Sequence, residues 1–203
     1  VHNVLRVRVV SIEGEVFEIG SEAPDAPGYD LLALMIGSEG MLGVVTEVTV
    51  KLVPKPELAQ VVMASFADVS KAGDAVAAII AAGIIPAGLE MMDKAATAAV
   101  EPYVKAGYDL NAAAILLCES DGTPEEVAEE IARVTEVLTA AGASDLRVSQ
   151  SEAGRLRFWA GRKAAFPAGG RITPGYYCMD GTIAVYSKKL KLPQEELGEI
   201  SVV

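Results

Sequence analysis

The first residues whose pattern suits ligand binding form a glycine run, Gly37-Ser38-Glu39-Gly40-Met41-Leu42-Gly43. The run lies between an apolar segment and a segment in which apolar and polar residues alternate. Glycine is costly in regular structure and is favoured where a backbone turns tightly or approaches another group closely. Successive amides in such a loop form concavities that bind anions such as phosphates. The spacing is G-x-x-G-x-x-G, not the G-x-G-x-x-G of a nicotinamide-type dinucleotide fold. The run predicts either a tight entry into a strand or an anion-binding loop.

A second group of candidate residues is cationic and lies late in the chain: Arg155, Arg157, Arg162, Lys163 and Arg171. The spacing predicts a helix over 152–166, on which Arg155, Arg162 and Phe166 share a face. An arginine binds a carboxylate with two parallel hydrogen bonds, which a lysine cannot do. This face is predicted either to bind an acidic ligand or to form solvated ion pairs with Asp and Glu.

The sequence lacks the residues that several kinds of catalytic or metal site require. The single histidine, His2, lies at the chain end, which disfavours a Ser-His-Asp or Cys-His mechanism and histidine-rich metal sites. Cys118 and Cys178 have neither metal-ligand nor C-x-x-C spacing, and we interpret them as neutral thiols in a reducing, cytoplasmic compartment. We therefore assign no catalytic residue and no metal site within this chain. A cofactor or further segments must supply most of the chemistry.

Composition narrows the class of protein and of partner. The 203 residues are 51% hydrophobic, which argues against disorder and suffices for a substantial core. A net charge of −11 disfavours nucleic acid and anionic membrane surfaces as partners. Glycine, proline or charge interrupts every apolar run before the length of a membrane span, so no transmembrane segment is expected.

The glycine run is predicted to be positioned by a small β-rich region. Two strands over 4–10 and 15–19 form a hairpin, and a short helix over 30–36 begins at a capping Asp30. After the glycine run, alternation over 44–52 predicts a half-buried strand. Pro54-Lys55-Pro56 ends this strand and marks the predicted domain boundary, because proline cannot extend a ladder.

Beyond the boundary, strands alternate with helices. Strands are predicted over 59–66, 84–91, 112–120, 146–149 and 176–180. Helices are predicted after Asp68 as far as Gly83, over 94–101 up to Pro102, after a Thr123 capping box as far as Gly142, and over 152–166. We interpret this order as an α+β sandwich of ferredoxin-like type, with an antiparallel sheet covered by helices on one face.

Segments in this order resemble a known family. Residues 28–36, the glycine run and residues 44–56 together resemble the end of the FAD domain in the vanillyl-alcohol oxidase / p-cresol methylhydroxylase family of flavoproteins. Residues 85–93, 158–168 and 176–183 resemble its branch of glycolate oxidase flavoprotein subunits and D-lactate dehydrogenases. Ala184 departs from the pattern, since a proline usually follows that last block.

The resemblance implies an organisation. Residues 1–56 would be the C-terminal part of an FAD-binding domain, and residues 57–203 a ferredoxin-like substrate or cap domain that is incomplete at its C-terminus. Both FAD and the main catalytic motifs would then involve segments outside this chain. The 203 residues alone are expected to be inactive and to bind FAD weakly or not at all.

The resemblance also implies roles for individual residues. Gly37, Ser38, Gly40, Gly43, Val44 and Val45 would contact FAD. Arg162 would hold the carboxylate of a 2-hydroxy acid whose hydride passes to the flavin. Phe166 and Cys178 stand where 2-hydroxyglutarate enzymes have a threonine and a lysine, which implies a smaller or more apolar acid such as glycolate or lactate.

Two alternatives to an oxidoreductase remain open at this level. One is a regulatory module whose ferredoxin-like domain binds a small effector, and the other is a docking subunit without catalysis. Partners considered are a small 2-hydroxy acid, other oxidase subunits, and a second copy of the chain, because an incomplete domain leaves sheet edges unpaired.

Overall fold

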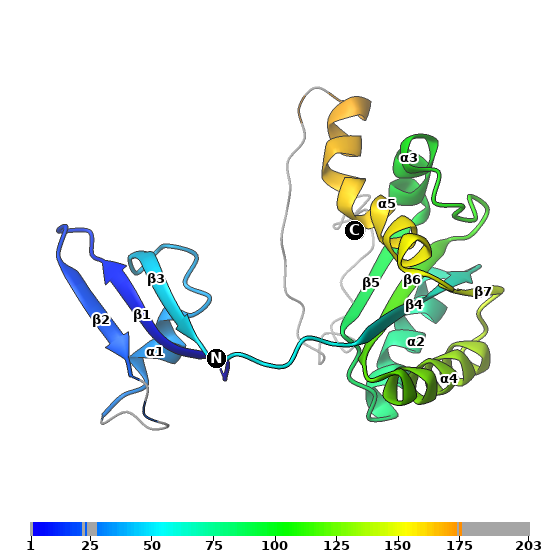
Figure 1. Cartoon of the computed structure of the whole chain (residues 1–203). Coiled ribbons are helices and arrows are strands. Elements are labelled where there is room, and N and C mark those ends of the chain that lie inside the picture. Colours follow the sequence, from blue (N-terminus) through cyan, green and yellow to red (C-terminus); the bar gives the residue numbers. More distant parts are fainter. Residues whose placement is uncertain (1, 22, 24–27, 174, 176–203) are drawn as a thin grey trace. The chain divides into compact units, whose positions relative to one another are not determined.

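The computed structural model describes residues 2–21, 23, 28–173 and 175 (Figure 1). The chain divides after Lys55 into two compact units, which are described here separately. The strand predicted over 176–180, and Cys178 with it, lies outside the described residues. In the part of the chain that the structure covers, no helix combines the length and the apolar composition needed to cross a membrane.

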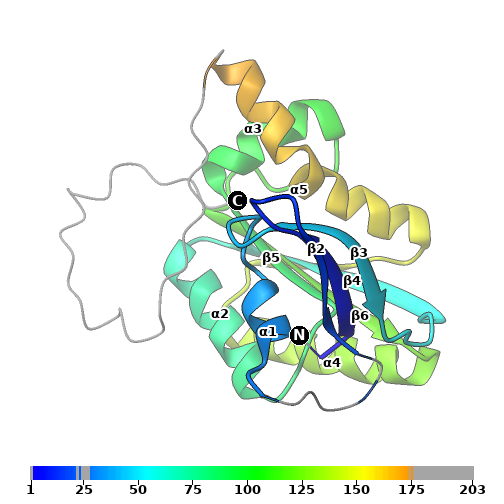
Figure 2. The same ribbon diagram turned by 90° about the vertical axis from the view of Figure 1, so that its left-hand side faces the viewer.

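Unit 1 is a three-stranded antiparallel sheet with one short helix, which can be followed in Figure 2. The predicted hairpin and the predicted helix cap are confirmed: the Asp30 carboxylate accepts a hydrogen bond from the Ala33 amide at 2.9 Å. The strand order is β2-β1-β3, and the elements are β1 (Val4–Val10), β2 (Val16–Gly20), α1 (Leu31–Met35) and β3 (Val44–Val50).

The strand β3 is more exposed than its alternation predicted. Val44, Val48 and Val50 are 63%, 53% and 47% exposed, so the prediction of a half-buried strand was wrong. Among its described residues, the buried core of this unit is small and consists of Val7, Val9 and Met35. It is small because α1 has only five residues and covers little of the sheet. Alternation therefore indicated a strand, but it did not reveal whether anything covers either face.

Unit 2 is built on a four-stranded antiparallel sheet of order β5-β6-β4-β7 (Figure 1). The succession β4-α2-β5-β6-α4-β7 is the predicted ferredoxin-like topology, with α3 inserted between β5 and β6 and α5 added at the end. Its elements are β4 (Leu58–Phe66), α2 (Val69–Ala81), β5 (Gly88–Asp93), α3 (Lys94–Val104), β6 (Ala114–Gly122), α4 (Pro124–Ala140), β7 (Asp145–Val148) and α5 (Glu152–Ile172).

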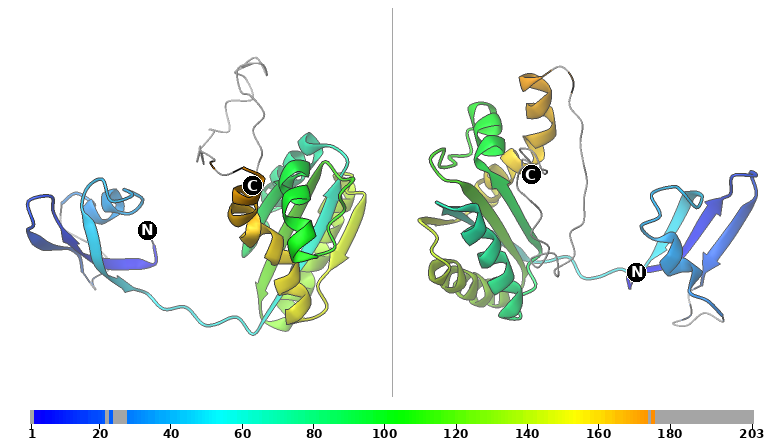
Figure 3. Two further views of the ribbon diagram at one scale, coloured as in Figure 1. Left: turned by 90° about the horizontal axis from the view of Figure 1, so that it is seen from above. Right: turned by 180° about the vertical axis from the view of Figure 1, so that it is seen from behind.

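Helices cover both faces of this sheet, as Figures 1 and 3 show, so the prediction of one covered face was wrong. On β4, Val62 and Phe66 pack with α2 and α4, whereas Val61 and Met63 pack with α3 and α5. The central strands β4 and β6 are buried on both sides, which explains their nearly continuous apolar sequences. The inserted helix α3 and the terminal helix α5 supply the second layer.

Two helices continue past prolines at which the sequence predicted breaks. The helix α3 extends beyond Pro102 to Val104, and α5 runs through Pro167 to Ile172 rather than ending at residue 166. A proline removes one backbone hydrogen bond, a loss that packing can offset near a helix end. Here the guanidinium of Arg171 lies 3.8 Å from the centre of the Tyr103 ring, which joins the ends of α5 and α3.

Candidate functional site

The glycine run links α1 to β3 within unit 1, and its backbone explains the glycines. Gly37 and Gly40 have φ of 81° and 80°, in the left-handed region that favours glycine. Gly43 has φ of 154°, and a Cβ there would lie 2.6 Å from Cγ1 of Val9. Two glycines therefore serve turns and the third allows a close approach to β1. Glu39 also has a positive φ, 51°, and is exposed.

Part of the loop's backbone is available to a ligand. The Ser38 amide donates to the Met35 carbonyl at 3.2 Å, and the Met41 amide donates to the Ser38 carbonyl at 2.9 Å. Between them, the amides of Glu39 and Gly40 meet no acceptor among the described residues. Consecutive amides of this kind can bind an anionic group.

The loop forms one wall of a hollow of about 370 Å³ in unit 1. The hollow brings together all six residues assigned to the cofactor: Gly37, Ser38, Gly40, Gly43, Val44 and Val45. Its other walls are mainly apolar and include Val4, Val7, Met35 and Val48. The arrangement suits a ligand that has both an anionic group and an apolar part.

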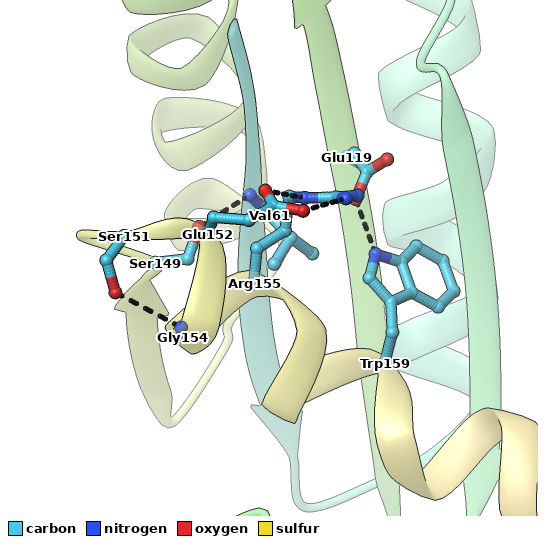
Figure 4. Close-up of polar contacts among 8 residues, drawn as sticks. All are labelled: Val61, Glu119, Ser149, Ser151, Glu152, Gly154, Arg155 and Trp159. Carbon is cyan, nitrogen blue, oxygen red and sulfur yellow. Dashed lines mark hydrogen bonds and ion pairs between the residues drawn. The ribbon is translucent and has the colours of Figure 1, made fainter.

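In unit 2, the helix α5 places Arg155 in a cluster of charges (Figure 4). The helix begins at Ser151, whose hydroxyl accepts a hydrogen bond from the Gly154 amide at 3.2 Å. Arg155 donates through Nε and Nη2 to the Glu152 carboxylate at 2.8 and 2.7 Å, and through Nη1 to Glu119 at 2.8 Å. These two carboxylates, Glu152 first, raise the pKa of Arg155. The Trp159 indole N–H donates to the same Glu119 oxygen.

Two turns further along α5, Arg162 reaches the neighbouring strand. Its Nε donates to Oε2 of Glu90 on β5 at 3.1 Å, and the two side chains are 26% and 42% exposed. The ion pair that was one of the two interpretations of Arg162 is therefore present. Its terminal nitrogens, Nη1 and Nη2, meet no acceptor among the residues described, so one edge of the guanidinium can still receive a carboxylate.

The other two predicted substrate residues are Phe166, one turn beyond Arg162 on the same helix, and Cys178. Phe166 is 54% exposed on α5, and Cys178 lies outside the described residues. Cys118 is buried in the core between the sheet and α2/α4, where burial raises the pKa of its thiol to about 12. In the described ranges, no group of His, Cys, Asp and Glu side chains is arranged to hold a metal ion.

The sequence analysis did not identify the carboxylate partners of the two arginines. Glu119 follows five consecutive buried residues of β6, and an acid directly after such a buried run indicates a partner on the element that covers the strand. Glu90 lies on β5 two residues beyond Gly88, which pairs with Glu119. One signal in the sequence could have revealed both ion pairs. Two arginines seven residues apart share a helix face, and two acids lie on the neighbouring strands.

Comparisons with known proteins all match the chain to one group of flavin-linked enzymes. Residues 55–187 match the family described as "FAD linked oxidases, C-terminal domain". The chain is 61% identical over 183 residues to the glycolate oxidase subunit GlcD of Escherichia coli K12, covering 90% of this chain and 37% of that protein. It is 32% identical over 184 residues to a mitochondrial D-lactate dehydrogenase [cytochrome] of Arabidopsis thaliana, covering 90% of this chain and 32% of that protein.

A solved structure has a related fold. The crystal structure of p-cresol methylhydroxylase with substrate bound aligns with a TM-score of 0.58 at 18% identity, covering 78% of this chain and 37% of that one. The chain thus spans about a third of the length of the curated relatives that it matches.

Proposed function

The chain belongs to the FAD-linked oxidases, whose C-terminal domain it contains, and on this premise we propose that it is part of an FAD-dependent oxidoreductase acting on a small 2-hydroxy acid. The observation that carries the proposal is the 61% identity, over 183 residues, to a glycolate oxidase subunit. A D-lactate dehydrogenase among the relatives supports the same substrate class. Nothing in these matches favours a regulatory module or a docking subunit without catalysis.

We propose that residues 1–56 complete an FAD-binding domain and that residues 57–203 belong to the substrate domain. The hollow in unit 1 suits one part of FAD. The amides of Glu39 and Gly40, which meet no acceptor on the described residues, suit a diphosphate, and the apolar wall at Val44 and Val45 suits a ring system. The exposed carboxylate of Glu39 would accept hydrogen bonds from ribose hydroxyls. When bound, FAD would accept the hydride from the α-carbon of the acid.

Arg162 is the residue proposed to hold the acid. Its Nη1–Nη2 edge, which meets no acceptor in the ranges that the structure describes, can bind a carboxylate with two parallel hydrogen bonds, which fixes the orientation of the acid as well as its position. Phe166 and Cys178 are proposed to favour a small acid, glycolate or D-lactate. We assign no general base within these 203 residues.

The test uses the intact oxidase in which this chain is embedded. Arg162→Ala is expected to raise KM for glycolate and D-lactate by about 30-fold or more, because a charged, bidentate hydrogen bond is lost. Arg147→Ala is the matched control, since Arg147 forms an exposed ion pair with Asp145 at 2.8 Å, and its KM should stay within twofold. An unchanged KM in the Arg162 variant would contradict the assignment.

Flavin content provides a second test. The intact oxidase is expected to purify with FAD, and the 203-residue chain alone to bind it weakly or not at all, because the chain supplies only part of the pocket. Absorbance near the flavin bands, measured against protein concentration, distinguishes the two. Stoichiometric flavin on the short chain would refute the division proposed for the FAD-binding domain.

We further propose that the intact protein works in the cytoplasm. We also propose that it assembles with other oxidase subunits, because the relative in Escherichia coli is itself named a subunit. Co-purification from the native source, followed by light scattering, tests the assembly. A monodisperse single polypeptide with full activity would contradict it, and two copies per particle would instead identify a homodimer.

A further inference from the structure

Arg162 differs from Arg155 in how its guanidinium is used. Arg155 is engaged on every edge, with Nε and Nη2 on Glu152 and Nη1 on Glu119. Within the described part of the chain, Arg162 is held through Nε alone, by Glu90 at 3.1 Å. A guanidinium offers a fork of planar donors, so a partner on Nε leaves the Nη1–Nη2 edge intact. Among the described residues, that edge has no acceptor.

The backbone around this contact is firmly placed. The two arginines are seven residues apart, about 10.5 Å along the helix, and each meets a carboxylate on the covered face of β5 or β6. Between them, the indole of Trp159 packs on Gly88, where a Cβ would lie 3.1 Å from its Cζ2. The Trp159 N–H also binds Glu119, as Figure 4 shows. The helix α5 is thus fixed in register against the strand that carries Glu90.

We propose that Glu90 is a positioning residue for substrate binding. By accepting the Nε–H of Arg162, it would fix the plane of the guanidinium and present the Nη1–Nη2 edge to the carboxylate of the acid. The inference rests on the proposed function, in which Arg162 binds that carboxylate. The charges alone predict a different role, in which Glu90 neutralises Arg162 and competes with the acid. The two roles predict opposite changes when Glu90 is replaced.

The experiment compares two substitutions of similar size in the intact oxidase. Glu90→Met removes the acceptor, whereas Glu90→Gln keeps a carbonyl oxygen that can still accept from Nε. Positioning predicts a KM for glycolate about fivefold to tenfold higher in E90M, with kcat within twofold, and a KM within about twofold of wild type in E90Q. Asp145→Asn, which alters an exposed pair on β7, is the control and should leave KM unchanged.

A spectroscopic measurement separates positioning from a loss of structure. The Arg162 Nε–H resonance, assigned by its absence in Arg162→Lys, is expected to shift in E90M and to stay near its wild-type position in E90Q. Because the Glu90 side chain is 42% exposed, both variants should unfold at the wild-type urea midpoint.

The outcomes distinguish this inference from the proposed function. An unchanged KM in Arg162→Ala overturns the proposed function itself. A raised KM in Arg162→Ala together with an unchanged KM in E90M overturns the positioning role alone. A KM that falls in both E90M and E90Q shows competition for Arg162 and also overturns it.

Discussion

Gly161 is predicted to be a glycine that unit 2 cannot replace, although it lies inside a helix. Tyr108, in the segment between α3 and β6, reaches across to α5, donates its hydroxyl hydrogen to the Phe158 carbonyl and accepts the Gly161 N–H at 3.1 Å. A Cβ on Gly161 would lie 2.2 Å from Cε2 and 2.4 Å from the hydroxyl oxygen of this ring. Either the tyrosine or the helix must therefore move in Gly161→Ala.

The magnitude follows from three contributions to the free energy of unfolding. Helix propensity favours alanine by about 1 kcal/mol. Overpacking against a buried ring costs about 1–3 kcal/mol, and displacing the tyrosine weakens two hydrogen bonds of about 1 kcal/mol each. We expect a net destabilisation of about 2 kcal/mol. Gly73→Ala is the matched control, because a methyl group added to that helical glycine would meet no atom within 4 Å and should stabilise by up to about 1 kcal/mol.

Urea unfolding followed by fluorescence measures both variants, since Trp159, the chain's single tryptophan, lies in the same helix. Combining Gly161→Ala with Tyr108→Ala should convert the penalty into a gain, because the clashing ring is then absent. The reasoning is refuted by a Gly161→Ala variant as stable as Gly73→Ala, or by a penalty that persists unchanged in the Tyr108→Ala background.

Three further predictions concern unit 2. Glu119→Ala should lower the free energy of unfolding by about 2 kcal/mol, because it removes the shared acceptor of Arg155 Nη1 and the Trp159 N–H at a part-buried site. Glu152→Ala, which removes an exposed partner of the same arginine, should cost less than about 1 kcal/mol in the same urea assay. Thr123→Ala should cost about 1 kcal/mol through loss of a helix cap, and an unchanged urea midpoint would contradict it. Burial raises the pKa of Tyr108 from 10.0 to about 12. The folded state therefore keeps the full stabilisation from the neutral hydroxyl below pH 10 and loses it as the pH rises towards 12. Tyr108→Phe should abolish this part of the alkaline loss of stability in a pH series of melting temperatures.

Local signals in the sequence determined the elements and their order. Asp68, Asp93 and Thr123 each accept a hydrogen bond from an amide of the helix that they cap. Such contacts depend on residues two or three positions apart, so they can be recognised without a fold. The alternation of strands and helices likewise determined the ferredoxin-like topology, since few arrangements satisfy that order.

The candidate site was only partly accessible from the sequence. The glycine run and Arg162 stand out by residue type and spacing, and the structure gives each a setting: a hollow for the first and an ion pair for the second. Their partners did not stand out. Glu90 and Glu119 become neighbours of α5 only when β5 pairs with β6 and the helix crosses both.

What the sequence by itself determined, therefore, is where the helices begin, the order in which helices and strands follow, and the family to which the chain belongs, whereas the strand predicted over 84–91 begins only at Gly88. Only the tertiary structure decided that helices cover both faces of the sheet, that α5 continues through Pro167, and which nitrogen of Arg162 binds Glu90. The physical reason is the sequence separation over which each interaction acts. Caps and periodicity act within one or two turns of chain, whereas burial, helix extension and ion pairing depend on residues that are tens of positions apart in sequence and meet only in the fold.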